Sequence, residues 1–270
     1  MPPLANAARR ESPIALRELI SAHELLWSFV RRDLIVRYRT PVMGIAWAIA
    51  PPLTQMAIFA LVFSRVAHLD VGMPYAPFAY VGLAAWTLTA ASLRAATTSL
   101  SSNAVLVSKV RFPREVLPLA AVCTALLDFL VAVPLTMVLT WYYGLPLTFA
   151  ILFFPIVAVI HVAFIAALAL LLSTANLFWR DVQPLFDVVI IVWMFATGVV
   201  YPTRGIEGRI GTLLAANPMT RIIEAYRDVI LRGRLPDALP VLGVALASFA
   251  LLAAALAVFH RSERYFAEVA

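Results

Sequence analysis

Long apolar stretches alternate with short polar segments along this chain. About 20 mainly apolar residues are needed for a helix to cross a bilayer whose hydrocarbon core is about 30 Å thick. Asp128 and Asp187 are the only charged residues within the five apolar stretches, which are residues 40–64, 71–93, 116–179, 182–203 and 238–259. The stretch at 116–179 is long enough for two crossings joined at residues 142–146. The pattern therefore predicts an all-α membrane protein with six transmembrane helices.

The segment before the first apolar stretch predicts an amphipathic helix. Residues 1–12 contain Pro, Ala and Arg, and we expect them to be disordered. A helix is expected to start at Pro13 and run to about Phe29, with an apolar stripe opposite its charges. Such a helix, rich in Leu and Trp, suits the membrane interface. Residues 13–39 thus form an interfacial helix and a basic segment before the first span.

The polar segment between the fourth and fifth apolar stretches, which would hold the fifth and sixth spans, has a helical pattern of its own. Asn217 and Pro218 are typical of a helix start. Pro has no backbone N–H, but an N–H in the first turn of a helix would have no partner within the helix in any case. Apolar residues then recur at helical spacing, opposite Arg221, Glu224 and Asp228; they are Met219, Ile222, Ile223, Tyr226 and Ile230. Glycines at 205, 208 and 211 supply bends before it. We expect interfacial or re-entrant outer helices here, with the apolar face in the outer leaflet.

Composition agrees with a single membrane domain over residues 40–260, followed by a cytoplasmic tail at 261–270. Hydrophobic residues make up 63% of the 270 and charged residues 13%, whereas soluble domains are about 45–50% apolar. The basic residues flank the spans, so they report orientation and contact with anionic lipid rather than nucleic acid. Placing both termini in the cytoplasm puts fourteen of the 21 Lys and Arg on the cytoplasmic side. Cys123 is the only cysteine, which excludes an intramolecular disulfide.

Sequence motifs for nucleotide, zinc or hydrolytic chemistry are not found. Lys109, the only lysine, has no glycine pattern before it, so the chain has no P-loop with which to hydrolyse ATP. His23 and Glu24 begin a zinc motif, but Trp27 stands at the second ligand position. The sequence therefore indicates no catalytic residue, metal or cofactor of its own.

Several short motifs, in order, resemble one family of transport proteins. They are Glu24–Trp27, Arg31–Arg39, Gly44–Trp47, Pro51–Leu53, Lys109–Pro118, Ala175–Val182, Gly198–Pro202 and Asn217–Arg227. Together they resemble the membrane-spanning permeases of ABC exporters that move O-antigen, capsule or teichoic-acid polysaccharides. Ala196-Thr197-Gly198 departs from the family, whose members more often have Pro after the Thr.

The resemblance implies partners and a substrate. Two copies of the chain would pair with two copies of a separate P-loop ATPase, which would hold ATP and Mg²⁺. The substrate would be a long polysaccharide on an undecaprenyl diphosphate carrier, exported across a bacterial inner membrane. A permease for drugs or small lipids is the nearest alternative. A membrane-embedded transferase acting on lipid-linked sugars is an alternative of another class, although it would need converging acidic or His residues.

Two basic clusters are candidate sites on the cytoplasmic side. The first lies where a lipid diphosphate would enter from the inner leaflet, because guanidinium groups bind phosphate oxygens in pairs; it consists of Arg31, Arg32, Arg37 and Arg39. An ordinary positive-inside anchor is the plainer interpretation. The second would dock the ATPase, with Phe112-Pro113 as a rigid apolar knob; it consists of Lys109, Arg111, Phe112, Pro113, Arg114 and Glu115. A solvated turn is its plainer interpretation.

Candidate residues also lie within and beyond the membrane. Asp128 is near the middle of its span, where a carboxylate is costly, and Thr124 one turn earlier is a possible donor to it. Trp193 is mid-span and a candidate for lining a conduit, although aromatic residues at span ends have the membrane–water belt as their ordinary explanation. We expect the outer helix to gate the conduit, with Glu224 and Arg227 holding the closed arrangement; the predicted gate residues are Ile222, Ile223, Glu224, Tyr226 and Arg227.

Overall fold

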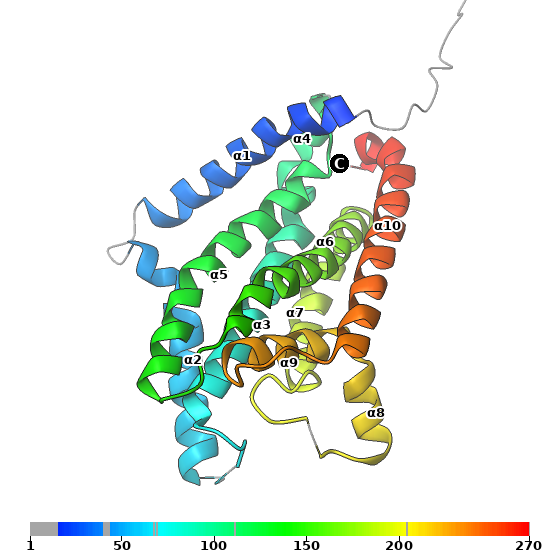
Figure 1. The fold of residues 1–270 in the computed structure, drawn as a ribbon. Coiled ribbons are helices and arrows are strands. Elements are labelled where there is room, and N and C mark those ends of the chain that lie inside the picture. The colour runs from blue at the N-terminus through cyan, green and yellow to red at the C-terminus, as the bar shows by residue number, and fades with distance from the viewer. Residues whose placement is uncertain are drawn as a thin grey trace, which may run out of the picture.

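The structure, a computed structural model, describes residues 16–39, 44–66, 68, 70–110, 112–203 and 205–269. Every regular element in these ranges is a helix. Figure 1 shows a bundle with α4, the start of α1 and the C-terminal end of α10 together at one end. Helices α8 and α9 lie at the other end. The predicted disordered residues 1–12 lie outside the described ranges.

Four helices are long and apolar enough to cross a membrane among the described residues. They are α3 (Tyr75–Ser99), α5 (Val116–Tyr142), α6 (Phe154–Phe178) and α10 (Ala238–Val269). Helix α3 packs against α5 and α6, and α10 packs along α6. Because α3 is buried on nearly all sides, it forms the centre of the bundle.

The other two apolar stretches form shorter helices. Residues 44–66 fold as a 3-10 turn (η1, Gly44–Ala48), α2 (Ala50–Ala60) and a π-helical turn (η2, Leu61–Val66). Helix α7 (Val182–Phe195) ends where the backbone turns through Gly198, which has a φ of 68°. The six predicted spans therefore correspond to four helices of spanning length and two shorter apolar helices. The two are shorter because local turns interrupt their apolar stretches.

The N-terminal helix is longer than the sequence pattern predicted. Helix α1 (Leu16–Tyr38) continues through the basic segment instead of ending near Phe29, since no Gly or Pro interrupts it there. Phe29 and Val30 are buried, and α1 packs on α5. Trp27 and Val36 are exposed. The helix is thus amphipathic along its length, with one face on the protein.

The outer segment forms α8 (Gly208–Ala216) and α9 (Pro218–Ile230). Asn217 caps α9, because its Oδ1 accepts a hydrogen bond of 3.0 Å from the Met219 amide. The apolar face of α9 packs against α3, α5, α6 and α10, and Ile222 and Ile223 are almost fully buried. The prediction that this face lies in the outer leaflet is therefore wrong: protein covers it. Helical periodicity identifies an apolar face without distinguishing lipid from a protein core.

The elements at the opposite end of the bundle from α8 and α9 also pack against one another. The connection from α3 to α5 contains η3 (Ser101–Asn103) and α4 (Ala104–Lys109). Helix α10 continues to Val269, so residues 261–269 extend the helix rather than forming a separate tail. Phe266 is fully buried, with its ring centroid 6.1 Å from that of Phe178 at the end of α6.

Gly82 in α3 allows the centre of the bundle to close. A Cβ at this position would lie 2.5 Å from the Val199 carbonyl oxygen and 2.7 Å from Nη2 of Arg227. We expect Gly82→Ala to lower the free energy of unfolding by about 1–3 kcal/mol, the usual range for overpacking. Thermal unfolding of the detergent-purified protein measures the loss.

Gly243→Ala is the matched control, because nothing lies within 4 Å of a Cβ at Gly243 in α10. Ala also favours a helix more than Gly does, so this variant should unfold at the same temperature as the wild type or higher. Equal unfolding temperatures for the wild type and Gly82→Ala would contradict the close packing of α3 at this point.

Candidate functional site

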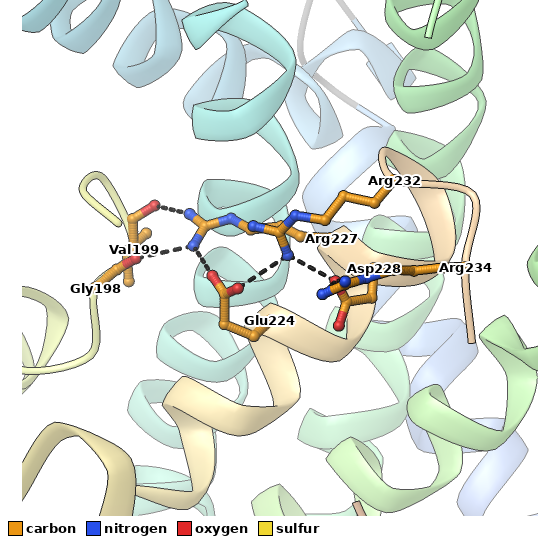
Figure 2. A network of polar contacts seen from close by, with 7 residues as sticks. All are labelled: Gly198, Val199, Glu224, Arg227, Asp228, Arg232 and Arg234. Atoms are coloured by element: carbon orange, nitrogen blue, oxygen red, sulfur yellow. Dashed lines mark hydrogen bonds and ion pairs between the residues drawn. The ribbon is translucent and has the colours of Figure 1, made fainter. Parts of the chain in front are cut away.

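A buried arginine on α9 joins three parts of the bundle (Figure 2). Arg227 is 0% exposed. Its Nη1 donates to the Gly198 carbonyl oxygen at 3.1 Å and to Oε1 of Glu224 at 2.8 Å. Its Nη2 donates to the Val199 carbonyl oxygen at 2.6 Å. The guanidinium also lies over the Phe78 ring of α3, with Cζ 3.6 Å from the ring centroid.

These contacts hold α9 against the turn that follows α7 and against α3. A buried charge is tolerated only when it is paired and hydrogen-bonded, and here two carbonyl oxygens and one carboxylate surround the guanidinium. The planar fork of Arg donates to separated acceptors from two nitrogens in fixed geometry, whereas a Lys ammonium donates from a single nitrogen. Arg227 therefore links α9 to both of these neighbours through polar contacts.

The network continues toward the start of the connection to α10. Nη1 of Arg232 donates to Oε2 of Glu224 at 3.0 Å and to Oδ1 of Asp228 at 2.8 Å. Arg234 Nε donates to the same Asp228 oxygen at 3.0 Å. Figure 2 shows the two carboxylates between the guanidinium groups. Each carboxylate thus bridges two arginines.

The pKa values of Glu224 and Arg227 keep this pair ionised near neutral pH. Burial alone would raise the pKa of Glu224, but Arg227 and Arg232 outweigh burial and hold the pKa below its ordinary value. Burial is the largest influence on Arg227 and lowers the pKa of its guanidinium to about 10, although Glu224 opposes this change. Both partners therefore carry charge at pH 7.

The apolar gate residues that the sequence predicted lie in the core beside this network. Tyr226 is 1% exposed, and its ring centroid is 5.7 Å from that of Phe129 and 5.4 Å from that of Phe154. Its hydroxyl lies 3.4 Å from Nδ1 of His161, whose Nε2 is 2.8 Å from Oγ1 of Thr89. Glu224 and Arg227, which the sequence predicted to hold a gate closed, form an ion pair with each other; their role in gating stays a prediction. The position of α9 thus combines a polar network with an aromatic core.

A second polar cluster joins α1 to α5. Arg37 pairs with Oδ2 of Asp128, and the Tyr38 hydroxyl donates to Oδ1 of Asp128 at 2.5 Å. Burial, followed by the hydrogen bond to Asp128, raises the pKa of Tyr38 to about 12. A pocket of about 630 Å³ lies beside the cluster and is lined by Tyr38, Arg39, Asp128 and apolar residues of both helices.

The four arginines of the predicted entrance thus differ in their surroundings. Arg37 and Arg39 are at pockets between α1 and α5. Arg32 pairs with Asp33 and lies over the Phe29 ring, and Arg31 is exposed. Of the four, Arg39 thus lines the 630 Å³ pocket, and Arg37 lines a neighbouring smaller one that η1, α2 and α3 also border.

Thr124 and Trp193 contact other parts of the chain than the sequence suggested. Thr124 Oγ1 donates to the Ala120 carbonyl oxygen at 2.9 Å, one turn back in α5, while the donors to Asp128 come from α1. Trp193 is half-buried, with ring centroids of Trp86 and Phe164 at 5.5 Å and 6.2 Å. The face of α7 that carries Trp193 therefore packs within the chain.

The predicted docking residues are partly used inside the chain. Lys109 is exposed, whereas Phe112 is half-buried with its ring centroid 6.4 Å from that of Phe29. Arg114 Nη1 donates to the Glu263 carbonyl oxygen at 2.7 Å, and Nη2 donates to the Val107 carbonyl oxygen at 3.0 Å. Arg114 thus fastens α4 to the end of α10.

The other three predicted docking residues are Glu115, Pro113 and Arg111. Glu115 is buried, with Oε1 3.6 Å from Nε2 of His260 on α10. Pro113 is half-buried. Arg111 lies outside the described residues. The surface left for a partner is therefore Lys109 with its exposed neighbours, which are Val105, Ser108 and Val110.

Sequence reasoning missed two residues that the structure brings into these clusters. Tyr38 follows Arg37 directly in the basic segment, and its aromatic ring was the available signal. His161 lies within an apolar stretch, where an ionisable residue is a signal for a polar contact. Neither partner, Asp128 or Tyr226, could be identified from local spacing, because each lies at least 65 residues away in the chain.

Comparison with known proteins shows what the chain is similar to. The ABC-2 type transporter family matches residues 24–231. The chain is 36% identical over 256 residues to the O-antigen export system permease protein RfbA of Myxococcus xanthus, covering 94% of this chain and 98% of the relative. It is also 29% identical over 248 residues to a protein of the same name from Klebsiella pneumoniae, covering 91% and 95%.

Removal of the Arg227 guanidinium should destabilise the protein strongly. Arg227→Met leaves Glu224 with one arginine fewer and two buried carbonyl oxygens without a donor. Breaking a buried pair on one side costs about 3–5 kcal/mol, so the unfolding temperature should fall by several degrees. Arg227→Lys should lie between this variant and the wild type, because it keeps the charge but loses the fork.

The pH dependence of unfolding checks the same network. The folded-state pKa of Glu224 is depressed, so its contribution to stability is complete above the unfolded pKa of about 4.3. The contribution is lost as the pH falls through the lower folded pKa. Glu224→Gln should therefore show a smaller fall in stability than the wild type between neutral and acidic pH. Identical pH profiles would contradict an ion-paired Glu224.

Proposed function

The chain belongs to the ABC-2 type transporter family, and we propose that it is the membrane permease subunit of an exporter for lipid-linked O-antigen polysaccharide. The observation that carries this proposal is the 36% identity to an O-antigen export permease over 94% of the chain. The family is one of transport membrane subunits, which agrees with a chain that has no P-loop motif.

The proposed arrangement has six spans in a bacterial inner membrane, with both termini in the cytoplasm. Four helices of spanning length support it, and α2 and α7 would provide the two remaining crossings. The excess of Lys and Arg at the end that holds α1 and α4 supports the orientation. Two copies of the chain would enclose the conduit. Helix α9, fixed by Arg227, would close its outer mouth until transport displaces it.

Energy would come from two copies of a P-loop ATPase that bind ATP and Mg²⁺. The docking surface for this partner is proposed at Lys109, Val110 and Arg111, next to α4. Phe112, Arg114 and Glu115 would support that surface from inside, since they contact α1 and α10. A movement of the docking surface would therefore be transmitted to α1, α4 and α10.

The diphosphate of the lipid carrier would enter between α1 and α5. Arg37 and Arg39 lie at the 630 Å³ pocket and its neighbour, and guanidinium groups bind phosphate oxygens in pairs. The apolar residues of the pocket wall suit the hydrocarbon part of a lipid. Arg31 and Arg32, farther from the pocket, would attract the same anion at longer range.

Deletion of this chain in its native host tests the function directly. Cells without it should keep lipid-linked polysaccharide inside the inner membrane, and the wild-type chain should restore surface O-antigen. Purification together with the P-loop ATPase encoded beside it should yield a complex that hydrolyses ATP. Normal surface polysaccharide in the deletion strain, with loss of drug or small-lipid efflux, would favour the alternative exporter.

Charge reversal at the docking surface should uncouple transport from ATP hydrolysis. Lys109→Glu with Arg111→Glu should lower surface O-antigen by tenfold or more, on the order of the loss expected when interface hot spots are changed. Protein abundance in the membrane should stay unchanged. Immunoblots of surface polysaccharide and membrane fractions measure both quantities.

Arg209→Glu is the matched control, because Arg209 is exposed on α8 at the opposite end of the bundle. It should export normally. Arg114→Glu should instead lower protein abundance, since its guanidinium donates to two carbonyl oxygens inside the chain. Wild-type export by the Lys109 and Arg111 double variant would remove this surface from the docking site.

A further inference from the structure

The polar face of α9 forms the floor of a pocket on the outer side of the molecule. This pocket has a volume of about 390 Å³, within the range of small-ligand sites. Its walls come from α8, the loop at Thr203 and Ile206, and the first turn of α10. An amphipathic surface helix would leave this polar face open to solvent. Here three other segments enclose it.

Charges of both signs line the pocket. Arg221 and Arg234 supply donors, and Glu224, Asp228 and Asp237 supply acceptors. Asp228 is 5% exposed and Glu224 14% exposed, so both are held in place rather than moving freely at the surface. Hydroxyl groups of Thr203 and Thr220 also line the cavity.

This composition excludes several classes of ligand. A phosphate or sulfate would meet three carboxylates beside the two arginines of the lining, so the lining has no excess of positive charge with which to bind an anion. A divalent cation needs free carboxylate oxygens, but Glu224 and Asp228 already accept hydrogen bonds from Arg227, Arg232 and Arg234. An apolar ligand would leave the charged groups without water or partners. A neutral ligand with many hydroxyl groups fits best, because each hydroxyl both donates and accepts.

We infer that the pocket between α8, α9 and the start of α10 binds a sugar unit of the exported polysaccharide on the outer side. The inference rests on the proposed export function and adds a saccharide-binding site to it. Asp237 would accept from sugar hydroxyls, and Arg221 would donate to them while its Nε holds the Ala215 carbonyl oxygen at 3.0 Å. Because Glu224 and Asp228 belong to both the pocket and the Arg227 network, a bound sugar would contact the residues that hold α9.

Protection of a thiol at the pocket tests the inference. Ala215 lines the pocket and is exposed, so Ala215→Cys in a Cys123→Ser background places a reactive thiol there. The probe is O-polysaccharide released from the host's lipopolysaccharide by mild acid. It should slow labelling by a charged maleimide on protein in nanodiscs. Asp237→Asn should weaken this protection about tenfold, the effect of losing a hydrogen bond to a charged group.

The matched control is Glu207→Gln, an exposed carboxylate of the same outer segment that does not line the pocket; its protection should equal that of the parent. Unchanged labelling at saturating polysaccharide in a chain that exports normally overturns the pocket and leaves the export function standing. Protection in a chain that supports no export overturns the export function and retains the pocket. Protection by phosphatidylglycerol vesicles alone, or equal protection in Asp237→Asn, also overturns the saccharide site.

Discussion

The fold depends on giving one buried guanidinium enough partners. Arg227 lies at the point where α3, the turn after α7 and α9 meet, and the Gly82 position leaves room for it. A charge removed from water is stable only with several acceptors around it. The two carbonyl oxygens at Gly198 and Val199 become acceptors because the backbone leaves α7 and turns at this point. The irregular end of α7 and the position of α9 therefore depend on the same hydrogen bonds.

The opposite end of the bundle uses the same chemistry. Arg114 donates to carbonyl oxygens of α4 and α10, as Arg227 does to those after α7. The Val107 carbonyl lies in the last turn of α4, where carbonyl groups have no partner within their own helix. The Arg114 fork contacts this oxygen and the Glu263 carbonyl oxygen at once. In both places an arginine adds fixed hydrogen bonds to the apolar packing of a connecting segment. Displacing either segment would therefore break polar and apolar contacts together.

Local sequence patterns predicted the helical class and the start of α9, because apolar run length and the Asn217-Pro218 cap depend on neighbouring residues only. The partners of the polar side chains could not be predicted in this way. Asp128 lies 91 residues from Arg37 in the chain, and the basic character of Arg114 indicated a solvated surface. The pattern of α9 also identified Ile222 and Ile223 as one apolar face, although the bundle decides that protein covers it. The partners of the polar side chains and the cover of this apolar face are set by tertiary contacts, which periodicity does not encode.

Helix α10 has a length with a mechanical consequence. It runs unbroken for 32 residues, or about 48 Å at about 1.5 Å per residue. One end borders the outer pocket at Pro240 and Val241, and the other accepts the hydrogen bond from Arg114. A stiff rod of this length converts a tilt of about 5° into a displacement of about 4 Å at its far end. Helix α10 therefore connects the two ends of the bundle as one continuous rod that packs along α6.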